Sequence, residues 1–545
     1  MRRGQTRSSD PGARFSYRGS GGGSLDGGDW PWLASLLLMG CVALSVFALT
    51  ASSLVDAEGG SLGPSKEPIP SLSRGVPLDD AWIHFQFARN LARGDGFAFN
   101  AGQPTAGSTA PLWSVLLAGV YALGGRFPLA GQVLSAASFL FALGATYALT
   151  RQLTGRRWTA WLAGAVVAVN GRMIWAGLSA LETCLFAALT LVAVSSHLRD
   201  RRAGRFRLRT AAVFGMAALV RPEGYLLFAL AVADAVLAAL ASPSPASRLA
   251  TCASRLLPGV ALFGALVLPY LVFSLRSAGH LLPNTFSAKA TFNFRPSLDF
   301  LSLASRYLVL DNLLLLPFFV LGVGVLLGGA RLLSVWTVGL PLVYAFLHAI
   351  LYQHGRYLIP LIPCNATAGV IGLLEARKLA RRRGWRWPGS ERALAALVAL
   401  LVVSGTGWRL PTMARQFAWN VENINEMHVT IGHWVAENTP PDALLALNDI
   451  GAIAYVSGRE VIDLAGLVTP EVTPMLRGPD TTERLIDYMT AREVDYVIIF
   501  PDWFPDLAQR GNVLTPVHSV TVERRTITGG RTIVVYRADW RARTE

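Results

Sequence analysis

The sequence predicts a polytopic α-helical membrane protein, with about eleven transmembrane helices and a C-terminal α/β domain. Of its 545 residues, 52 % are hydrophobic and only 15 % are charged, whereas about a quarter of the residues in a soluble globular protein are charged. The charged residues are also segregated, which leaves repeated apolar runs of about 20 residues, the length that crosses a bilayer. The four cysteines show no CxxC pairing and indicate neither a disulfide framework nor a zinc site.

We divide the chain into five parts. Residues 1–29 are rich in Arg, Ser and Gly and are expected to form a disordered cytoplasmic tail. The apolar run 30–52 is too long and too late for a cleaved signal peptide, so it is predicted as a retained first transmembrane helix. An extracytoplasmic loop with surface helices follows at 53–126, then a transmembrane bundle at 127–410 and an extracytoplasmic α/β domain at 411–545. The crossings predicted within the bundle are about 127–150, 158–176, 178–197, 210–220, 223–241, 256–275, 308–328, 333–351, 357–374 and 391–410.

The distribution of charge predicts the orientation. The net charge is +14, and basic clusters at 151–157, 199–209 and 375–392 lie between apolar segments. From 411 to 545 there are 12 basic and 18 acidic residues, a net charge of −6. Basic loops mark the cytoplasmic side of a membrane protein, so these clusters indicate topology and not a nucleic-acid partner. If 108–124 crossed the membrane, the first two clusters would lie outside, so we expect a helix at the outer surface there.

The C-terminal segment has the pattern of a small α/β domain. Helical periodicity predicts helices at 423–438 and 481–492. Short apolar runs predict strands at 444–447, 494–500 and 532–536. The chain has no GxGxxG or P-loop fingerprint, which argues against the common nucleotide-binding sites. It also has no internal repeat of the kind found in many transporters.

Two adjacent carboxylates, Asp79 and Asp80, open an aromatic-rich helical pattern soon after the first transmembrane segment. Carboxylates beside a bilayer are costly to desolvate, so their presence favours a chemical role. The structural alternative is a helix N-cap, which applies to Asp79 more than to Asp80 because Asp80 lies inside the first turn.

Under the predicted topology, the unusual polar residues of the chain gather on its outer face. They are Asp79, Asp80, His84, Glu182, Arg221, Glu223, Asn284, Lys289, His354, Arg356 and Tyr357. Carboxylates together with Arg, Lys and His at the mouth of a helical bundle are typical of a site for chemistry on a charged amphiphile. The lone histidine of the amphipathic helix, His84, is more often a packing residue than a catalytic one.

Several of these residues also have a structural interpretation. Glu182 is placed to cap a helix, and Arg221 can pair with Glu223 across a proline kink. Lys289 and Arg356 can be interfacial cations that extend toward the lipid headgroups. No HxxxH or HExxH spacing marks a metal site, so the sequence leaves the requirement for a divalent metal open.

The stretch DDAWIHFQFARNLARGDGFAFNAGQPTAGSTAPLW at 79–113 resembles the first outer loop of GT-C glycosyltransferases. The likeness is to the bacterial branch that uses polyprenyl-phosphate sugars, including actinobacterial cell-wall arabinofuranosyltransferases. The segments GLSALETCLF, LVRPEGYLL, LPNTFSAK, HGRYLIPLIP and NDIGAIAYVSGREVIDLAGLVTPE are similar to further signposts of that branch. The sequence departs from the arabinofuranosyltransferase motif at Gln86, where Arg is usual, and at Ser108-Thr109-Ala110.

The resemblance implies an enzyme that transfers a hexose or pentose from a polyprenyl phosphate on the outer leaflet, with inversion at the anomeric carbon. In such families an aspartate of the first outer loop is the general base, a role that falls here on Asp79 or Asp80. Cations at the membrane boundary should stabilise the phosphate leaving group, and the planar fork of Arg356 makes it the first choice. The other candidates for binding the donor phosphate and sugar are Lys289, Arg221, Glu182, His354 and Tyr357.

Two other functions compete with this one. A transporter or flippase of lipid-linked sugars would need polar groups near the bilayer midplane, where the predicted crossings have few beyond Asp234. A non-catalytic envelope-assembly protein would use the C-terminal domain to bind partners. The sequence does not identify the sugar or decide whether the acceptor is a glycan, a lipid or a protein.

Overall fold

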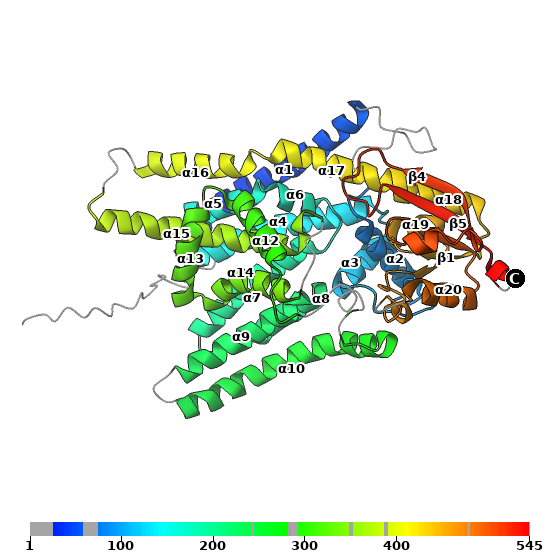
Figure 1. Ribbon diagram of the computed structural model, residues 1–545. Coiled ribbons are helices and arrows are strands. Elements are labelled where there is room, and N and C mark those ends of the chain that lie inside the picture. Colours follow the sequence, from blue (N-terminus) through cyan, green and yellow to red (C-terminus); the bar gives the residue numbers. More distant parts are fainter. Residues whose placement is uncertain are drawn as a thin grey trace, which may run out of the picture.

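The computed structural model describes residues 25–57, 75–241, 245–281, 283, 293–347, 353–385, 391–476 and 480–543. A bundle of apolar helices makes up the larger part of the protein, and a mixed β-sheet lies at one end of it (Figure 1). The helices before the sheet are α1 (Trp30–Ala57), α2 (Asp79–Arg93), α3 (Pro111–Ala122), α4 (Leu129–Thr154), α5 (Arg157–Ala168), α6 (Gly171–Gly177), α7 (Thr183–Arg202), α8 (Leu208–Val220), α9 (Glu223–Leu240), α10 (Pro245–Ala278), α12 (Leu298–Asn312), α13 (Leu316–Gly329), α14 (Arg331–Phe346), the 3-10 segment η2 (Gln353–Leu361), α15 (Ile362–Arg382), α16 (Glu391–Gly407), α17 (Leu410–Ile424), the π-helical η3 (Asn425–Val429) and α18 (Thr430–Asn438).

Six of the described helices are long and apolar enough to cross a membrane, or seven if one bent pair counts as a span. This confirms a multi-pass membrane protein, whereas the count of eleven crossings stays a prediction. Helix α3 has 12 residues and is among the shorter apolar helices. It packs against α2 and α8, and its position outside the bilayer stays a prediction.

Two predicted crossings are not single straight helices. The crossing expected at 158–176 is broken between α5 and α6, where the Asn170 side chain accepts hydrogen bonds from the backbone N–H groups of Arg172 and Met173. The crossing expected at 308–328 is instead the pair α12 and α13, bent by 103°. Pro317 lies in the first turn of α13, and a proline disfavours helical backbone in the residue before it.

The described structure begins at residue 25, before the predicted end of the disordered tail at residue 29. Asp29 is completely buried, and its carboxylate accepts a hydrogen bond of 2.7 Å from the Tyr147 hydroxyl and one of 3.0 Å from Arg151 Nε. Residues 25–29 therefore do not belong to a disordered tail, because contacts with α4 hold them. The rest of the predicted tail, 1–24, lies outside the described residues.

The C-terminal part contains a five-stranded sheet in the order β2-β1-β3-β5-β4. Strand β1 is parallel to β2 and β3, whereas β5 is antiparallel to β3 and β4. The elements are β1 (Leu444–Leu447), α19 (Gly451–Ser457), β2 (Glu460–Asp463), η4 (Pro470–Val472), α20 (Thr481–Ala491), β3 (Tyr496–Ile499), α21 (Pro505–Ala508), β4 (Leu514–Thr521), β5 (Thr532–Ala538) and η5 (Trp540–Arg543). The predicted strands correspond to β1, β3 and β5. The predicted helix at 481–492 corresponds to α20, whereas the helix predicted at 423–438 comprises the end of α17, the π-helical η3 and α18.

The two faces of the sheet have different partners. Val497 and Ile499 of β3 pack on one face with Leu485 of α20. On the other face, Leu447 and Ile498 share a core with residues of α18 and α19 and with Phe87 of α2. Helix α2 thus belongs to the core of the C-terminal part, and Figure 1 shows α2 and α3 between the bundle and the sheet.

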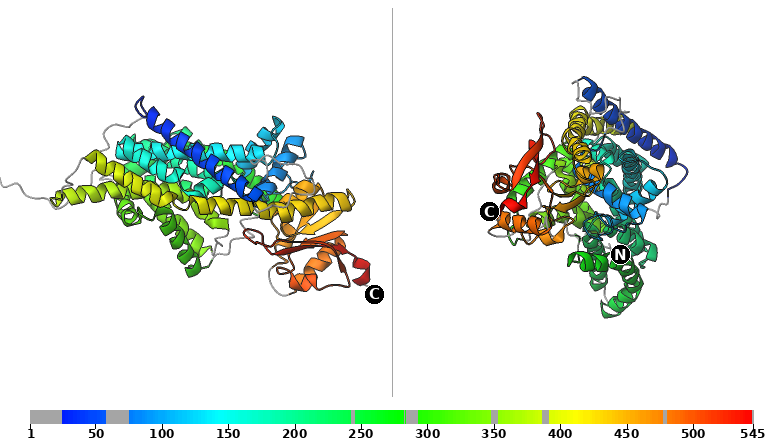
Figure 2. Two further views of the ribbon diagram at one scale, coloured as in Figure 1. Left: turned by 90° about the horizontal axis from the view of Figure 1, so that it is seen from above. Right: turned by 90° about the vertical axis from the view of Figure 1, so that its right-hand side faces the viewer.

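A long helical run connects the bundle to the sheet. Helices α16, α17 and α18 follow one another along the molecule, as the yellow segment in Figure 2 shows. Helix α17 packs against α1 inside the bundle, and α18 packs against α19 beside the sheet. The bundle and the C-terminal part are therefore linked both by this run and by the shared core around α2.

Candidate functional site

The two carboxylates that open α2 have different partners. Helix α2 begins at Asp79, and its N-cap residue Leu78 makes no side-chain capping bond. The Asp79 carboxylate instead accepts hydrogen bonds from the backbone N–H groups of Gly451 and Ala452, each at 2.7 Å. The interpretation of Asp79 as the N-cap of α2 is therefore wrong. Its side chain binds the backbone of the first residues of α19, in the C-terminal part, and not the start of α2.

A second polar pair lies beside this contact. His428 is fully buried, and its Nε2 atom is 2.9 Å from Asp449 Oδ2. Loss of solvent around Asp79 raises the pKa of its carboxyl group from 3.8 to about 6, against the opposing effects of His428 and of the two backbone N–H groups. Asp79 is thus a partly buried carboxylate in a polar contact between α2 and the C-terminal part.

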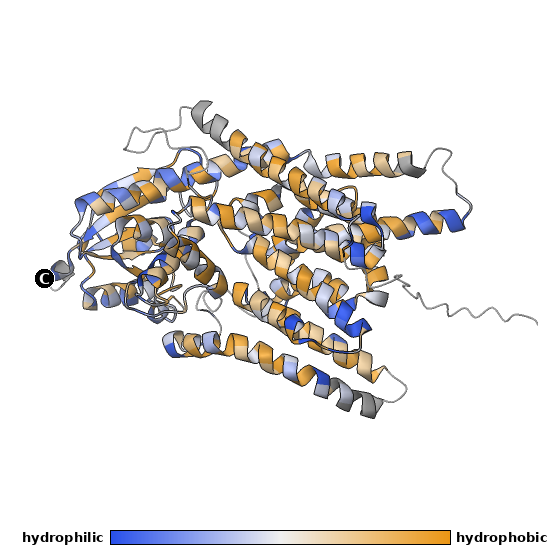
Figure 3. Cartoon of the chain, turned by 180° about the vertical axis from the view of Figure 1, so that it is seen from behind, coloured by the Kyte–Doolittle hydropathy of each residue, from blue (hydrophilic) through white to orange (hydrophobic). Residues whose placement is uncertain are grey.

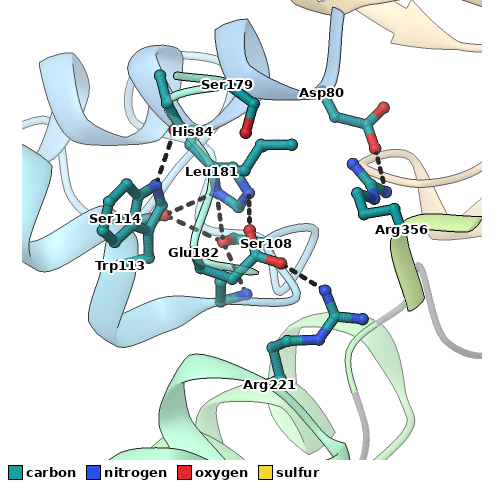
Figure 4. A network of polar contacts seen from close by, with 12 residues as sticks. Asp80, His84, Ser108, Trp113, Ser114, Ser179, Leu181, Glu182, Arg221 and Arg356 are labelled. Atoms are coloured by element: carbon teal, nitrogen blue, oxygen red, sulfur yellow. Dashed lines mark hydrogen bonds and ion pairs between the residues drawn. The ribbon is translucent and has the colours of Figure 1, made fainter. Parts of the chain in front are cut away.

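Asp80 faces an arginine of the bundle. Its Oδ2 atom lies 2.6 Å from Arg356 Nη2, and Figure 4 shows the two side chains facing each other. The Asp80 side chain is 25 % exposed and the Arg356 side chain is 9 % exposed. Arg356 Nε has no hydrogen-bond partner among the described residues. The structure therefore brings together the base candidate and the first-choice phosphate ligand, with the carboxylate accessible to solvent.

Hydrogen bonds from Arg172 hold the backbone turn that carries Arg356. His354 and Gly355 have left-handed conformations, with φ of 62° and 64°, which is costly for a residue with a side chain. Their carbonyl oxygens accept hydrogen bonds of 2.7 Å from Arg172 Nε and Nη2 respectively. Arg172 is also paired with Asp311. This arrangement fixes the backbone immediately before Arg356.

The His354 and Tyr357 side chains have distinct positions. His354 Nε2 is 2.9 Å from Asn420 Oδ1, so this ring is engaged by α17. The Tyr357 ring lies 5.4 Å from the Arg221 guanidinium and 5.6 Å from that of Arg356. Tyr357 therefore lies near both arginines of the site, whereas His354 has a partner outside the Asp80–Arg356 pair.

Arg221 connects two glutamates. Its Nη1 atom is 2.6 Å from Glu182 Oε1, and its Nη2 atom is 2.7 Å from Glu223 Oε1. The Tyr344 hydroxyl also donates a hydrogen bond to Glu223. Glu182 occupies the N-cap position of α7 but makes no capping bond. The local pairing of Arg221 with Glu223 is therefore observed, and the capping interpretation of Glu182 is wrong because Arg221 binds its carboxylate.

His84 lies in a buried polar network next to these ion pairs (Figure 4). Its Nδ1 atom is 3.3 Å from Ser114 Oγ and 3.4 Å from Ser108 Oγ, and its Nε2 atom is 3.8 Å from Glu182 Oε2. Burial lowers the pKa of His84, and the charges of Asp80 and Glu182 oppose this shift. The sequence contained one signal for the position of His84. It lies four residues after Asp80 in α2, and residues i and i+4 share a helix face.

Comparison with solved structures gives the fold. Over 92 % of its length the chain is similar to ArnT from Cupriavidus metallidurans bound to undecaprenyl phosphate, with a TM-score of 0.58, 15 % identity and 98 % of that chain covered. The chain has the GT-C fold. A second neighbour with this fold is the archaeal oligosaccharyltransferase AglB from Archaeoglobus fulgidus in complex with an inhibitory peptide and a dolichol-phosphate. The TM-score is 0.55 at 13 % identity, covering 92 % of this chain and 74 % of that one.

Sequence comparison gives one further match. Residues 420–544 match the family model described as a domain of unknown function, DUF8728. No curated protein matches the chain. The resemblance of the first outer loop to GT-C glycosyltransferases is thus confirmed at the level of the fold.

Two parts of the predicted GT-C site are not placed. Lys289 and Asn284 lie outside the described residues. Across the described ranges, no group of three or more His, Cys, Asp or Glu side chains is arranged to hold a metal ion. The guanidinium groups of Arg356 and Arg221 supply positive charge at the described site.

Proposed function

We propose that this protein is a membrane glycosyltransferase that moves a sugar from a polyprenyl-phosphate donor to an acceptor hydroxyl at the outer face. The observation that carries the proposal is the Asp80–Arg356 pair. It joins α2 to the turn before α15 and contains one carboxylate and one guanidinium within 2.6 Å. A base for the acceptor and a cation for the leaving group are the two functions that this transfer needs.

Arg356 is the proposed ligand of the donor phosphate. A guanidinium presents several N–H donors in a planar fork that matches phosphate geometry, and Arg356 Nε is unsatisfied within the described part of the chain. The similar ArnT structure contains undecaprenyl phosphate and the AglB structure contains dolichol-phosphate, which supports a lipid phosphate as the ligand. The Asp80 carboxylate is paired with Nη2 of this guanidinium, at a different nitrogen from Nε.

Donor binding would change the role of Asp80. When the phosphate takes over Arg356, the Asp80 carboxylate leaves this ion pair and can accept the proton of the acceptor hydroxyl. The acceptor oxygen then forms a bond to the anomeric carbon while the bond from that carbon to the phosphate oxygen breaks. The electron pair stays on the phosphate, the proton goes to Asp80, and the products are the inverted glycoside and the polyprenyl phosphate.

Arg221 has a supporting role in this scheme. Glu182 and Glu223 already compensate its charge, so it is a weaker phosphate ligand than Arg356. The Tyr357 ring lies near both guanidinium groups. We therefore propose that Arg221, Glu182 and Tyr357 orient Arg356 and the sugar. Direct binding of the phosphate is assigned to Arg356 alone.

The orientation of the site follows from charge. Hydrophilic helix ends gather at the end of the bundle remote from the sheet (Figure 3). These ends include the basic last turns of α7 and α15. Because basic segments stay in the cytoplasm, we propose that the opposite end, with Asp80 and the C-terminal part, is extracytoplasmic.

Asp234, the polar residue that a flippase could use, is engaged in this structure. Its carboxylate lies 2.9 Å from His197 Nε2, 2.7 Å from Arg201 Nη1 and 3.0 Å from Arg331 Nε. A carboxylate surrounded by cations from α7 and α14 is typical of a structural cluster between helices. No described contact therefore favours the flippase over the transferase.

The test is transfer of radiolabelled pentose and hexose from synthetic polyprenyl-phosphate donors in membranes that contain the cell's own envelope acceptors. Asp80→Asn keeps the shape of the side chain and removes its basicity, so turnover should fall about 10²- to 10⁴-fold. Asp95→Asn, in the same outer loop, is the matched control and should keep wild-type turnover. Normal turnover of Asp80→Asn would remove Asp80 as the base, and absence of transfer by the wild type from every donor would overturn the proposed function.

A further inference from the structure

The residue before Asp80 is bonded to the C-terminal part. Asp79 accepts hydrogen bonds from Gly451 and Ala452, as described above. The approach is close, because a Cβ atom on Gly451 would lie 2.2 Å from the Asp79 carbonyl oxygen and 2.7 Å from Asp79 Oδ2. Only glycine allows the two backbones to approach this far. The position of α19 therefore determines where α2 begins.

Further contacts fix the same helix along its length. Arg89 Nη1 donates a hydrogen bond of 2.9 Å to the Tyr455 carbonyl oxygen, and its guanidinium lies 4.2 Å from the centre of the Tyr455 ring. In the loop after α2, Asn100 makes two hydrogen bonds with the backbone of Val461, at 2.9 and 3.1 Å. The first outer loop and the C-terminal part are thus joined by backbone, side-chain and apolar contacts.

The turn that carries Arg356 has a separate link to the C-terminal part. His354 bonds to Asn420 Oδ1 at 2.9 Å, and Asn420 Nδ2 donates a hydrogen bond of 3.0 Å to Thr526 Oγ1. Thr526 precedes strand β5. The chain of contacts therefore runs from the C-terminal part to the residue two positions before Arg356.

We infer that the C-terminal domain, whose residues 420–544 match DUF8728, is a positioning element that holds Asp80 through Asp79 and Arg356 through His354. This inference rests on the proposed function and assigns a role to that domain. Asp79 and His354 are positioning residues, since each acts through a neighbour that faces the reacting groups. Transfer depends on geometry at this level, because a misplacement of about 1 Å can slow a reaction about 100-fold.

Two substitutions in the domain test the inference without changing a charged group. Gly451→Ala places a methyl group against Asp79 and should push α19 away from α2. Thr526→Val keeps the shape of the side chain and removes the acceptor of Asn420. Each should lower kcat about 10- to 100-fold, while the KM for the polyprenyl-phosphate donor changes by less than about threefold, because the phosphate ligand itself is intact.

Matched controls come from the same domain. Gly511→Ala places a methyl group in open space, with no atom within 4 Å of the added carbon. Thr521→Val removes an exposed hydroxyl whose partner is Thr532, at 2.8 Å. Both controls should keep wild-type kcat. Melting temperature and kcat per folded molecule are measured for all four variants, so that a loss of folded protein is not counted as a loss of turnover.

A double-mutant cycle adds a measurement that a merely structural role would not reproduce. If Asp79→Asn and Gly451→Ala act through one contact, the double variant should lose about as much kcat as the more affected single variant, instead of the product of both losses. Should Gly451→Ala misfold, Asp79→Asn and Thr526→Val carry the test. Wild-type kcat in the folded variants, together with an inactive Asp80→Asn, would overturn the positioning role alone. Full activity of Asp80→Asn would instead overturn the base assignment in the proposed function.

Discussion

The Asp80 carboxylate and the Arg356 guanidinium are 2.6 Å apart although 276 positions separate the two residues in the chain. The neighbouring carboxylate of Asp79 binds α19 in the C-terminal part. Consecutive residues of an α-helix are rotated by about 100° around its axis. One side chain of the pair can therefore face the bundle while the other faces the sheet.

Arg356→Gln should weaken donor binding. The substitution removes the charge that the phosphate needs and leaves a shorter, neutral side chain, so the KM for the donor should rise about 10- to 100-fold. Turnover should also fall, because the leaving phosphate is less stabilised, whereas the KM for the acceptor should be unchanged. A titration of donor and acceptor measures both constants. Arg93→Gln, at the exposed end of α2, is the control, and identical donor constants for Arg356→Gln and wild type would remove Arg356 from the site.

Arg221→Met should destabilise the fold. It leaves Glu182 and Glu223 in a buried site without their common cation, and loss of one partner of a buried ion pair costs about 3–5 kcal/mol. Unfolding in detergent measures the change. Arg510→Met breaks the exposed pair with Glu483 and should cost less than about 1 kcal/mol. Equal stability of the two variants would show that the Arg221 cluster is not a buried ion pair in the membrane.

We expect the stability of the fold to depend on pH because the pKa of the Asp79 carboxyl group is raised. Its pKa in the folded protein is raised to about 6, so the folded state holds a proton that the unfolded chain releases near its ordinary pKa. This group therefore stabilises the fold most below about pH 4, and the contribution is lost as the pH rises through about 6. Relative to Asp79→Asn, the wild type should lose up to about 3 kcal/mol across this window.

Melting temperatures of both proteins between pH 4 and pH 7 measure this difference. The charge of Asp79 also raises the pKa of the neighbouring His428, so the comparison measures the titration of Asp79 together with its effect on the His428–Asp449 pair. A difference that does not change with pH, or that rises with pH, would contradict the raised pKa of Asp79.

Cysteine labelling can decide the topology. On a Cys-free background, Arg126→Cys should react with an impermeant reagent from outside, whereas Arg156→Cys should be protected until the membrane is opened. Arg156 is a better reporter than Gly155, whose φ of 68° disfavours a side chain. The reverse labelling pattern would mean that the segment containing α3 crosses the bilayer and that the predicted orientation is wrong.

Local patterns were sufficient for part of the structure. The apolar run predicted for β1 has the bounds of the observed strand, and those of β3 and β5 lie within a few residues of them. Strand β4 was missed because most of its residues are exposed and show no apolar run. Strand β2 was missed because it has an acidic residue at each end and only two apolar residues between them. Short strands in a sheet depend on their neighbours, so a local pattern is weak there.

The sequence by itself determined that the chain is a membrane protein, that two carboxylates open the first helical pattern after the N-terminal apolar segment, and which polar residues were candidates for the site. Only the tertiary structure decided that Asp79 binds Gly451 and Ala452, that Asp80 faces Arg356, and that Arg221 joins Glu182 to Glu223. The physical reason is that apolar runs and helix periodicity are local properties of the sequence, which can be recognised from neighbouring residues alone. The partner of a buried charge is instead set by packing between segments far apart in the chain.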